Sequence, residues 1–378
     1  MATLTQTAKQ VKIMINVVLA CTIIFIGYRI VVKIFQGLQT FTPTPIVPDN
    51  LLGKISFPTF STVDIDSKVT YTLDLIDSDL PTSPKIMPVY TKIPYTVGLL
   101  SPERAKEIAK NYNYDPEQYN EITSTKYQWT DLNLPRNITI DLTTRNFEIN
   151  YDYKKDPSVF TQTTFRSQQN ASTKAIQILN RGKSLPDDIN SGKQITTLMT
   201  WKNEQFTEAT DYDTKNSAKI YFQRQDITII DENEKENVYP AVGDTPDKGP
   251  IYMEISSSPE QNKDILKLTF NYYSVDTTKS GTYYIKSASE AWQEIQLGKG
   301  NVVFFDAPTG KTYSEIAIKR VYLAYFDQTV KQDYLQPIWV FVGEAKLNDK
   351  SRAIYISYLT AVTDDWIEKN EAVDEVSN

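Results

Sequence analysis

IAIKRVYLAYF, at residues 316–326, and LQPIWVFV, at residues 335–342, are the two stretches that decide the fold predicted for this chain. Large apolar and aromatic side chains occupy both the odd-numbered and the even-numbered positions of each stretch. This pattern is typical of strands that are buried on both faces. The polar connection at 327–334 allows the two strands to pair in antiparallel fashion. We therefore expect them to form the centre of a C-terminal sheet that is covered on both sides.

A short amphipathic helix is predicted just before this sheet, at residues 287–297. Ser287 and Glu290 match a capping box, in which each side chain accepts a hydrogen bond from the other residue's backbone amide. Trp292 and Ile295 share one helical face, so the helix is expected to cover one face of the sheet. The opposite face is then left to the middle of the chain or to another protein.

Tyr322, Phe326 and Trp339 are the residues that we name as a candidate contact surface on this sheet. Large rings on strands are ordinarily core residues, so burial in the core is the alternative. If the surface is free, it contacts either the middle region at 156–250 or a partner protein. No catalytic, cofactor-binding or metal-binding residue is named beside them.

Residues 13–35 form a mostly apolar stretch that is long enough to cross a lipid bilayer as a helix. Arg29 and Lys33 lie four residues apart and can reach the same headgroup layer. Two basic residues precede the stretch and two lie at its far end, so charge counting does not orient it. The Pro/Thr-rich stretch at 42–48 is typical of a stalk, which favours residues 36–378 outside the cell and the N-terminus inside.

Three other interpretations of the N-terminal stretch stay open. Val18-Leu19-Ala20-Cys21 resembles a lipobox, in which Cys21 would be lipidated, although the residues after Cys21 are apolar rather than polar. A cleaved signal peptide would need a small-x-small site before a polar segment, and a buried core helix is ordinarily less apolar. We expect a retained anchor, which makes the lipid bilayer a partner of residues 13–35.

These patterns, with a second helix and hairpin at 101–112 and 138–151, predict the α+β fold class. An N-terminal transmembrane helix is followed by predominantly antiparallel β modules that each carry a short amphipathic helix. The predicted parts are a cytoplasmic tip and anchor (1–35), a Pro/Thr stalk (36–62), a first α+β module (63–155), a middle β-rich region with an acidic loop at 231–250 (156–250), a C-terminal α+β module (251–370) and a tail (371–378).

This order of helix and strands resembles PepSY-type modules and the membrane-anchored extracellular regulators of bacterial cell-wall sensor kinases. The residues that carry the resemblance are 101–109 with the hairpin near 141–147, Ala291-Trp292 with Gly298, 321–325 and 335–341. The resemblance implies binding, by an inhibitory or sensory domain that contacts another envelope protein. It carries over no catalytic residue and leaves the middle region without a role.

Composition and motifs exclude several classes of function. The absence of His and the single Cys remove His-dependent catalysis, His-ligated zinc and an intrachain disulfide. All 47 acidic residues lie in 36–378, and such a surface argues against nucleic-acid binding. Gly310-Lys311-Thr312 ends like a phosphate-binding loop, but Phe305 stands where the first Gly is required, so no nucleotide site is expected.

Pairs of acidic residues keep two further activities open. Asp64 with Asp66, Asp77 with Asp79 and Asp211 with Asp213 have oxygen ligands that suit calcium. None of these pairs continues into an EF-hand loop, so we expect no metal and no cofactor. A glycosidase needs only two carboxylates at the right separation, and the sequence offers no way to choose such a pair.

We therefore expect a non-catalytic, single-pass membrane protein whose extracytoplasmic domains bind another envelope protein, either to regulate it or to assemble with it. The alternative is a surface-exposed structural or adhesive protein that binds a glycan or a cell surface. Exposed apolar surface at the edge of a module would favour a protein partner. An exposed pair of Trp rings beside acids would favour a glycan.

Overall fold

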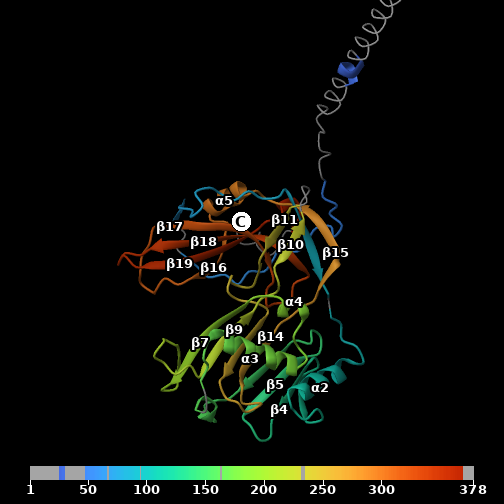
Figure 1. Cartoon of the computed structure of the whole chain (residues 1–378), viewed down its shortest axis with the longest axis vertical. Helices are drawn as coiled ribbons and strands as arrows, with labels where there is room; N and C mark the ends of the chain where they lie inside the picture. The colour runs from blue at the N-terminus through green and yellow to red at the C-terminus, as the bar shows by residue number, and fades with distance from the viewer. Residues whose placement is uncertain are drawn as a thin grey trace, which may run out of the picture. The chain divides into compact units, whose positions relative to one another are not determined.

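The fold is given by a computed structural model of the chain (Figure 1). The structure describes residues 25–29, 47–65, 68–93, 95–161, 164–230 and 235–368. Residues 1–47 and 48–378 are two separate units, and both sheets belong to the second unit.

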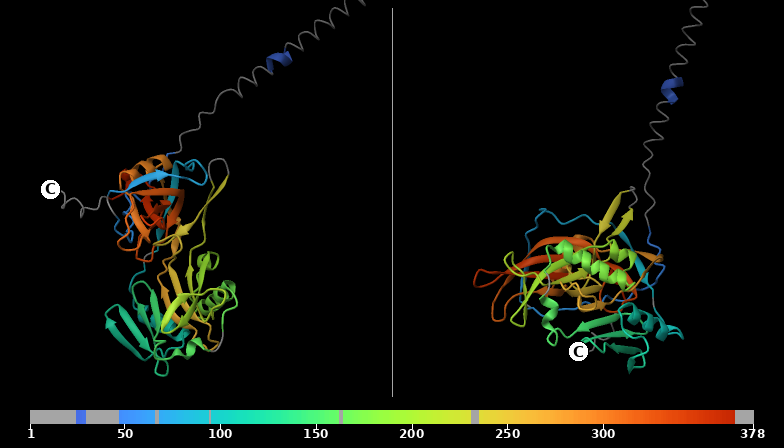
Figure 2. Two further views of the ribbon diagram at one scale, coloured as in Figure 1. Left: turned by 90° about the vertical axis from the view of Figure 1, so that its left-hand side faces the viewer. Right: turned by 60° about the horizontal axis from the view of Figure 1, so that its bottom comes forward.

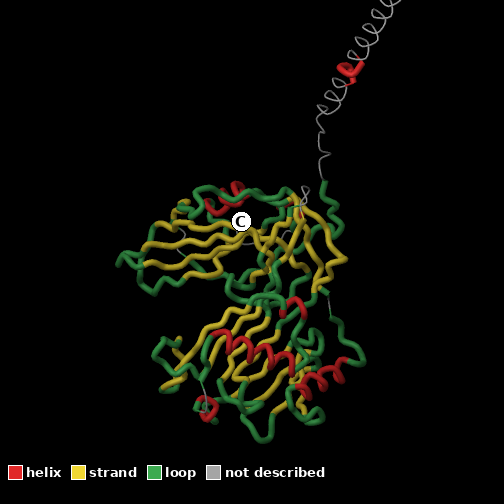
Figure 3. The backbone as a smooth tube through the Cα atoms, viewed as in Figure 1, coloured by secondary structure: helices red, strands yellow, loops and turns green. Residues whose placement is uncertain are grey.

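The structure corrects the predicted fold class. Of the described residues, 40% lie in strands and 16% in helices, so the protein is mainly β rather than α+β (Figure 3). Within the described ranges, no helix combines the length and the apolar character needed to cross a membrane. Of the predicted span at 13–35, residues 25–29 are described and helical, and the remainder lies outside the described residues.

One sheet has nine strands, and every neighbouring pair in it is antiparallel. In spatial order the strands are β3 (Tyr119–Thr123), β4 (Lys126–Thr130), β5 (Arg136–Asp141), β6 (Phe147–Tyr151), β14 (Ile265–Phe270), β13 (Ile251–Ser256), β9 (Ser217–Phe222), β7 (Gln194–Lys202) and β8 (Gln205–Glu208). The predicted hairpin at 138–151 is confirmed as β5 and β6.

Two helices, α2 (Ser101–Asn111) and α3 (Gln168–Arg181), cover one face of this sheet (Figure 2). Ala105 and Ala109 of α2 are buried, and such small side chains let a helix lie close to strands. The Ser167 side chain begins α3 by accepting a hydrogen bond from the Asn170 amide. The helix predicted at 101–112 is confirmed.

The other sheet has eight strands and is built around the stretches that opened the sequence analysis. They form β17 (Glu315–Phe326) and β18 (Tyr334–Lys346), which pair in antiparallel fashion as predicted. The remaining strands are β1 (Thr70–Leu73) and β12 (Ala241–Val242), both parallel to β17, with β19 (Arg352–Thr360), β16 (Asn301–Phe305), β2 (Ile86–Lys92) and β15 (Val275–Tyr284).

Helix α5 (Ala288–Gln296) lies on one face of the eight-stranded sheet, as predicted. Ser287 and Glu290 form the expected capping box. Trp292 and Ile295 pack beside Phe341, with the Trp292 and Phe341 ring centroids 6.5 Å apart. The helix therefore buries the strand pair from one side.

Four short elements lie outside these layers. The two-stranded hairpin of β10 (Ile227–Ile230) and β11 (Glu236–Tyr239) contacts the eight-stranded sheet through β17. The others are η1 (Pro157–Phe160), α4 (Asp187–Asn190) and η2 (Asp364–Trp366). Strands β11 and β12 lie within the stretch at 231–250 that was predicted to be a loop, and residues 231–234 lie outside the described residues.

The sheets do not follow the predicted module boundaries. Strands β13 and β14 lie beyond residue 250 but pair with β9 and β6 of the nine-stranded sheet. Strand β12 lies before residue 250, and β1 and β2 lie in the predicted first module, yet all three belong to the eight-stranded sheet. The boundaries at 155 and 250 are corrected accordingly, because long-range strand pairing overrides the order along the chain.

Candidate functional site

The three residues named from the sequence do not share a surface. Phe326 and Trp339 are fully buried, and Tyr322 is half-buried. In the β17/β18 register, Tyr322 lies opposite Val340, whereas Leu323 lies opposite Trp339. Residues directly opposite each other share a face, so Trp339 points to the other side of the sheet from Tyr322.

Each face of the sheet already has its cover. Trp339 lies on the side of α5, and its Nε1 donates to the backbone oxygen of Lys286 at 2.9 Å. Phe326 packs with Val242 and Phe60, and the Phe326 and Phe60 ring centroids are 4.9 Å apart. Of the two occupants considered for that face, the middle region is therefore the one present, through Val242.

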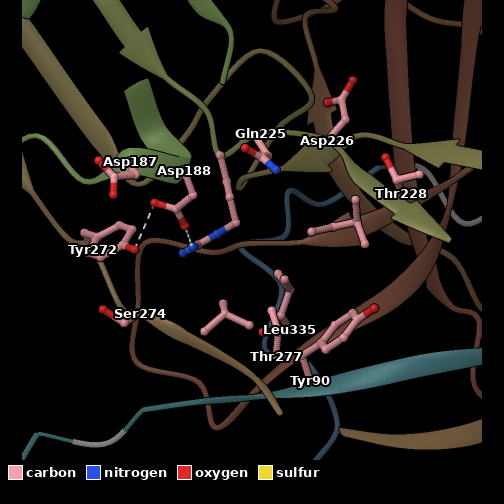
Figure 4. A pocket seen from close by; sticks show the side chains of 13 residues that line it. Tyr90, Asp187, Asp188, Gln225, Asp226, Thr228, Tyr272, Ser274, Thr277 and Leu335 are labelled. Carbon is pink, nitrogen blue, oxygen red and sulfur yellow. Dashed lines mark hydrogen bonds and ion pairs between the residues drawn. The ribbon is translucent and has the colours of Figure 1, made fainter. Parts of the chain in front are cut away.

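A groove of about 640 Å³ lies where the two sheets meet, and we call it the junction groove (Figure 4). Its walls come from α4, from the stretch 224–228, which includes the start of β10, and from the stretch 272–277, which includes the start of β15. Tyr90 of β2 and Leu335 of β18 complete the lining. Neither sheet forms this groove alone.

Asp188 and Arg224 line the groove, and Arg224 is linked through Asp327 to Lys92. We call these four buried or half-buried residues the charge network. Arg224 Nε donates to Asp327 Oδ2 at 2.9 Å, and Lys92 Nζ donates to the other oxygen of Asp327 at 2.8 Å. Arg224 also donates to Asp188 and, at 2.8 Å, to the backbone oxygen of Tyr273. The side chains of Lys92, Arg224 and Asp327 are 2–3% exposed, so their charges must satisfy one another.

The electrostatics of the network keep the Asp327 carboxylate charged at neutral pH. Burial acts to raise the pKa of Asp327, but Arg224 and Lys92 overcome this effect and lower that pKa to about 2. Burial raises the pKa of Tyr272 to about 12; Arg224 opposes this shift, and Asp188, which accepts the Tyr272 hydroxyl at 2.9 Å, adds to it. Neither group is suited to proton transfer near pH 7, so the network is suited to joining the two sheets.

The groove beside the network carries acidic charge that the network does not neutralise. Asp187 of α4 is exposed, and Asp226 before β10 is 3.7 Å from the exposed Lys193. Arg224 is already occupied by Asp327 and Asp188. The free lining is therefore acidic and polar around the rings of Tyr90 and Tyr272.

Two strands that border the groove have a partner on one side only. Over the described residues, β10 pairs with β11 alone and β15 pairs with β2 alone. The outer face of the β10–β11 hairpin exposes two apolar side chains, Ile230 (65%) and Val238 (58%), beside Thr228 and Glu236. Strand edges of this kind can accept a further strand through backbone hydrogen bonds.

The acidic pairs considered for calcium do not assemble into a metal site in the part of the chain that the structure describes. No group of three or more His, Cys, Asp or Glu residues with metal-binding geometry occurs there. Asp213 accepts hydrogen bonds from the amide and hydroxyl of Thr210 instead. Asp66 lies outside the described residues.

Sequence reasoning missed both the junction groove and the charge network. One signal was available: Asp327 directly follows a strand with two apolar faces, where a charged residue needs a buried partner. Its partners Lys92 and Arg224 are more than a hundred residues away along the chain. No local pattern identifies such partners.

Comparisons with known proteins add little to this geometry. No family model matches the chain, and no curated protein matches it. An uncharacterised protein from Eubacterium rectale ATCC 33656, with a crystal structure at 1.45 Å resolution, matches with a TM-score of 0.41 and 12% identity over 81% of this chain and 92% of that one. This likeness is too distant to bear on function. The resemblance to PepSY-type modules and to sensor-kinase regulators stays a prediction.

Proposed function

We propose that this protein is a non-catalytic binding protein that holds an extended segment of another envelope protein in the junction groove. The observation that carries the proposal is the β10–β11 hairpin, whose outer face exposes Ile230 and Val238 beside the groove. Exposed apolar surface at a sheet edge favours a protein partner.

The strands around the groove support an extended conformation for that segment. An incoming strand can pair with the free edge of β10 or with the start of β15, before Thr282, whose backbone is already bonded by Asp49 and Asn50. Such pairing supplies backbone hydrogen bonds whatever the sequence of the partner. Tyr90, Tyr272 and Leu335 offer apolar contact area for alternate side chains of the segment. The groove of about 640 Å³ has room for only a few residues, so the contact is short.

The charge of the groove supports a basic segment. Asp187 and Asp226 border the opening from α4 and from the start of β10. Since Arg224 is neutralised within the charge network, no free cation of the lining offsets these two carboxylates; Lys193 lies outside the lining and is exposed. Lys or Arg side chains on the partner would therefore find complementary charge.

The glycan alternative lacks the observation that would favour it. Trp129, Trp292 and Trp339 are buried, and Trp201 and Trp366 are half-buried. Trp201 packs among Tyr153, Phe160 and Phe206 rather than standing free. These five side chains do not present a pair of exposed rings beside acids.

Site-specific photo-crosslinking in whole cells tests the proposal. A photoreactive residue at Thr228, in the groove, should crosslink to one partner, and the same residue at Thr207 on β8 should not. The double variant Asp187→Asn with Asp226→Asn should lower the yield at Thr228 by about fivefold or more, because it removes the complementary charge. Equal crosslinking from both positions, or a yield indifferent to the double variant, would contradict the proposal.

The location predicted from the sequence is separate from this proposal. Attachment to the cell membrane through residues 13–35, with the N-terminus inside, concerns a segment that lies mostly outside the described residues. It stays a prediction. Protease added to intact cells checks it, since a large part outside the cell would be degraded while the membrane stays closed.

A further inference from the structure

A second pocket, of about 370 Å³, lies on the nine-stranded sheet between α2, the turn that joins β5 to β6, and the end of α3. Each of these elements contributes a cation, Arg104, Arg145 and Lys183 respectively, and we call this site the cationic pocket. Glu107 is the one carboxylate among its lining residues. The chain as a whole carries a net charge of −7, so this concentration of positive charge runs against its general character.

The three cations have no carboxylate partner in the part of the chain that the structure describes. Within the described ranges no ion pair joins any of them to an acid, and Glu107, one helical turn from Arg104, does not pair with it. Elsewhere in the molecule, Arg136, Arg181 and Arg224 are each held by an aspartate. Unpaired cations that converge on a cavity are available to an anion from solution.

Local structure positions the charged group of Arg145 and fixes the backbone of Lys183. Arg145 lies in a tight turn in which the Asp141 side chain accepts the amides of Thr143 and Thr144, and its φ of 60° places it in the left-handed region. Its guanidinium carbon is 4.8 Å from the centroid of the Tyr95 ring, which orients the group without neutralising it. Lys183, with a φ of 50°, follows the last turn of α3. A site with positioned donors loses less entropy on binding.

The floor of the pocket is aromatic. Phe147 and Phe270 stack with ring centroids 4.8 Å apart and an interplanar angle of 11°. Tyr95 and Tyr272 also line the cavity. An apolar floor lowers the local dielectric constant, which strengthens the attraction of the cations above it for an anion.

We propose that the cationic pocket binds a phosphate group. Three cations exceed what a single carboxylate needs, and guanidinium groups match the oxygens of phosphate through paired hydrogen bonds. The phosphate can belong to a soluble molecule or to a lipid headgroup. The proposal goes beyond the binding of an envelope protein in the junction groove and does not depend on it.

Pyrophosphate is the probe that tests the site, by titration calorimetry on the full-length chain. The wild type should bind it with one-to-one stoichiometry, and Arg104→Gln with Arg145→Gln should weaken binding by about tenfold or more, since two charge-assisted contacts are lost. Lys154→Gln, an exposed cation beyond the other end of β6, is the matched control and should change affinity by less than about twofold. Arg145→Lys should fall between the wild type and the double variant, because it keeps the charge and loses the paired geometry.

Two outcomes would overturn the proposal. One is no detectable heat with millimolar pyrophosphate from a protein whose circular dichroism and melting temperature are those of a folded chain. The other is equal affinity of the wild type and a double variant that melts at the same temperature. Asp187→Asn with Asp226→Asn in the junction groove should leave pyrophosphate affinity within about twofold, so failure of one proposal is distinguishable from failure of the other.

Vesicle sedimentation separates the two sources of phosphate. If the group belongs to a lipid, the double variant should sediment less than the wild type with phosphatidylglycerol vesicles, and the two should behave alike with phosphatidylcholine, where the choline masks the phosphate charge. If it belongs to a soluble molecule, pyrophosphate binding depends on the arginines while sedimentation does not. If neither pyrophosphate binding nor vesicle sedimentation depends on the arginines, the phosphate site is contradicted.

Discussion

The charge network and the cationic pocket both lie beside Tyr272, and they use the same kinds of side chain in opposite ways. In the network, Arg224 and Lys92 converge on Asp327 in a nearly dry interior, and each charge is satisfied by another. In the pocket, Arg104 and Arg145 form no ion pair with a carboxylate among the described residues, and both line the cavity. Pairing is therefore the feature that separates cations that join the two sheets from cations that are available to a ligand.

Removal of the central carboxylate should give the largest effect. Asp327→Ala leaves Lys92 buried without a counter-charge and Arg224 with Asp188 alone. It should lower the free energy of unfolding by about 3–5 kcal/mol, measured by urea denaturation. Asp365→Ala, at an exposed position, is the control and should lie within about 0.5 kcal/mol of the wild type. A loss below about 1 kcal/mol for Asp327→Ala would show that the network is not essential to the junction.

The residue before Asp327 separates apolar burial from buried charge. Phe326→Ala should also cost about 3–5 kcal/mol, because a fully buried ring is replaced by a cavity between Phe60 and Val242. Tyr322→Ala should cost less, since Tyr322 is only half-buried. Urea denaturation of both variants measures the difference. An equal, small loss of stability at both positions would show that Phe326 is not a core residue.

The pH dependence of stability should distinguish the same two positions. The pKa of Asp327 is lowered from 3.8 to about 2, so its contribution is fully present above pH 3.8 and is lost as the pH falls through about 2. The lowered pKa corresponds to about 2 kcal/mol, so the stability gap between the wild type and Asp327→Asn should narrow by that amount from pH 5 to about 2. The gap between the wild type and Phe326→Ala should not follow this curve. A constant gap for Asp327→Asn would contradict the assignment.

The more exposed end of the network should matter less. Asp188 is 30% exposed and accepts hydrogen bonds from Arg224 and from the Tyr272 hydroxyl. Asp188→Asn should therefore lower the free energy of unfolding by about 1–2 kcal/mol, because Arg224 can still donate hydrogen bonds to Asp327 and to water. Thermal denaturation at several salt concentrations measures the loss. A cost equal to that of Asp327→Ala would show that both carboxylates are needed together.

The cationic pocket should give the smallest effect on stability. Arg104→Gln with Arg145→Gln breaks no ion pair, so the free energy of unfolding should change by less than about 0.5 kcal/mol. Comparison of urea midpoints for this variant and for Asp327→Ala sharpens the contrast between the two groups of charges. Destabilisation by more than about 1.5 kcal/mol would mean that the pocket cations are structural, as those of the network are.

Local pattern alone was sufficient for several elements of this fold. Two-faced apolar strands, the Ser287/Glu290 capping box and the alternation at 138–151 each appear in the structure where the sequence placed them. Periodicity and caps depend on neighbours a few residues away, so they can be recognised from the sequence. Strand β2 was missed because Pro88 and its neighbouring prolines disguise it, although Tyr325 donates a hydrogen bond to the Pro88 oxygen within the sheet.

The sequence by itself therefore determined several strands and helices and the apolar faces that had to be buried. The tertiary structure alone decided which strands pair, so that β13 and β14 join the nine-stranded sheet, and which face each ring occupies. The β17/β18 register placed Tyr322 and Trp339 on opposite sides, although both were correctly assigned to strands. The tertiary structure also brought Lys92 and Arg224 to Asp327. Pairing between distant segments is set by the packing of the whole core, and a short window of sequence holds no record of it.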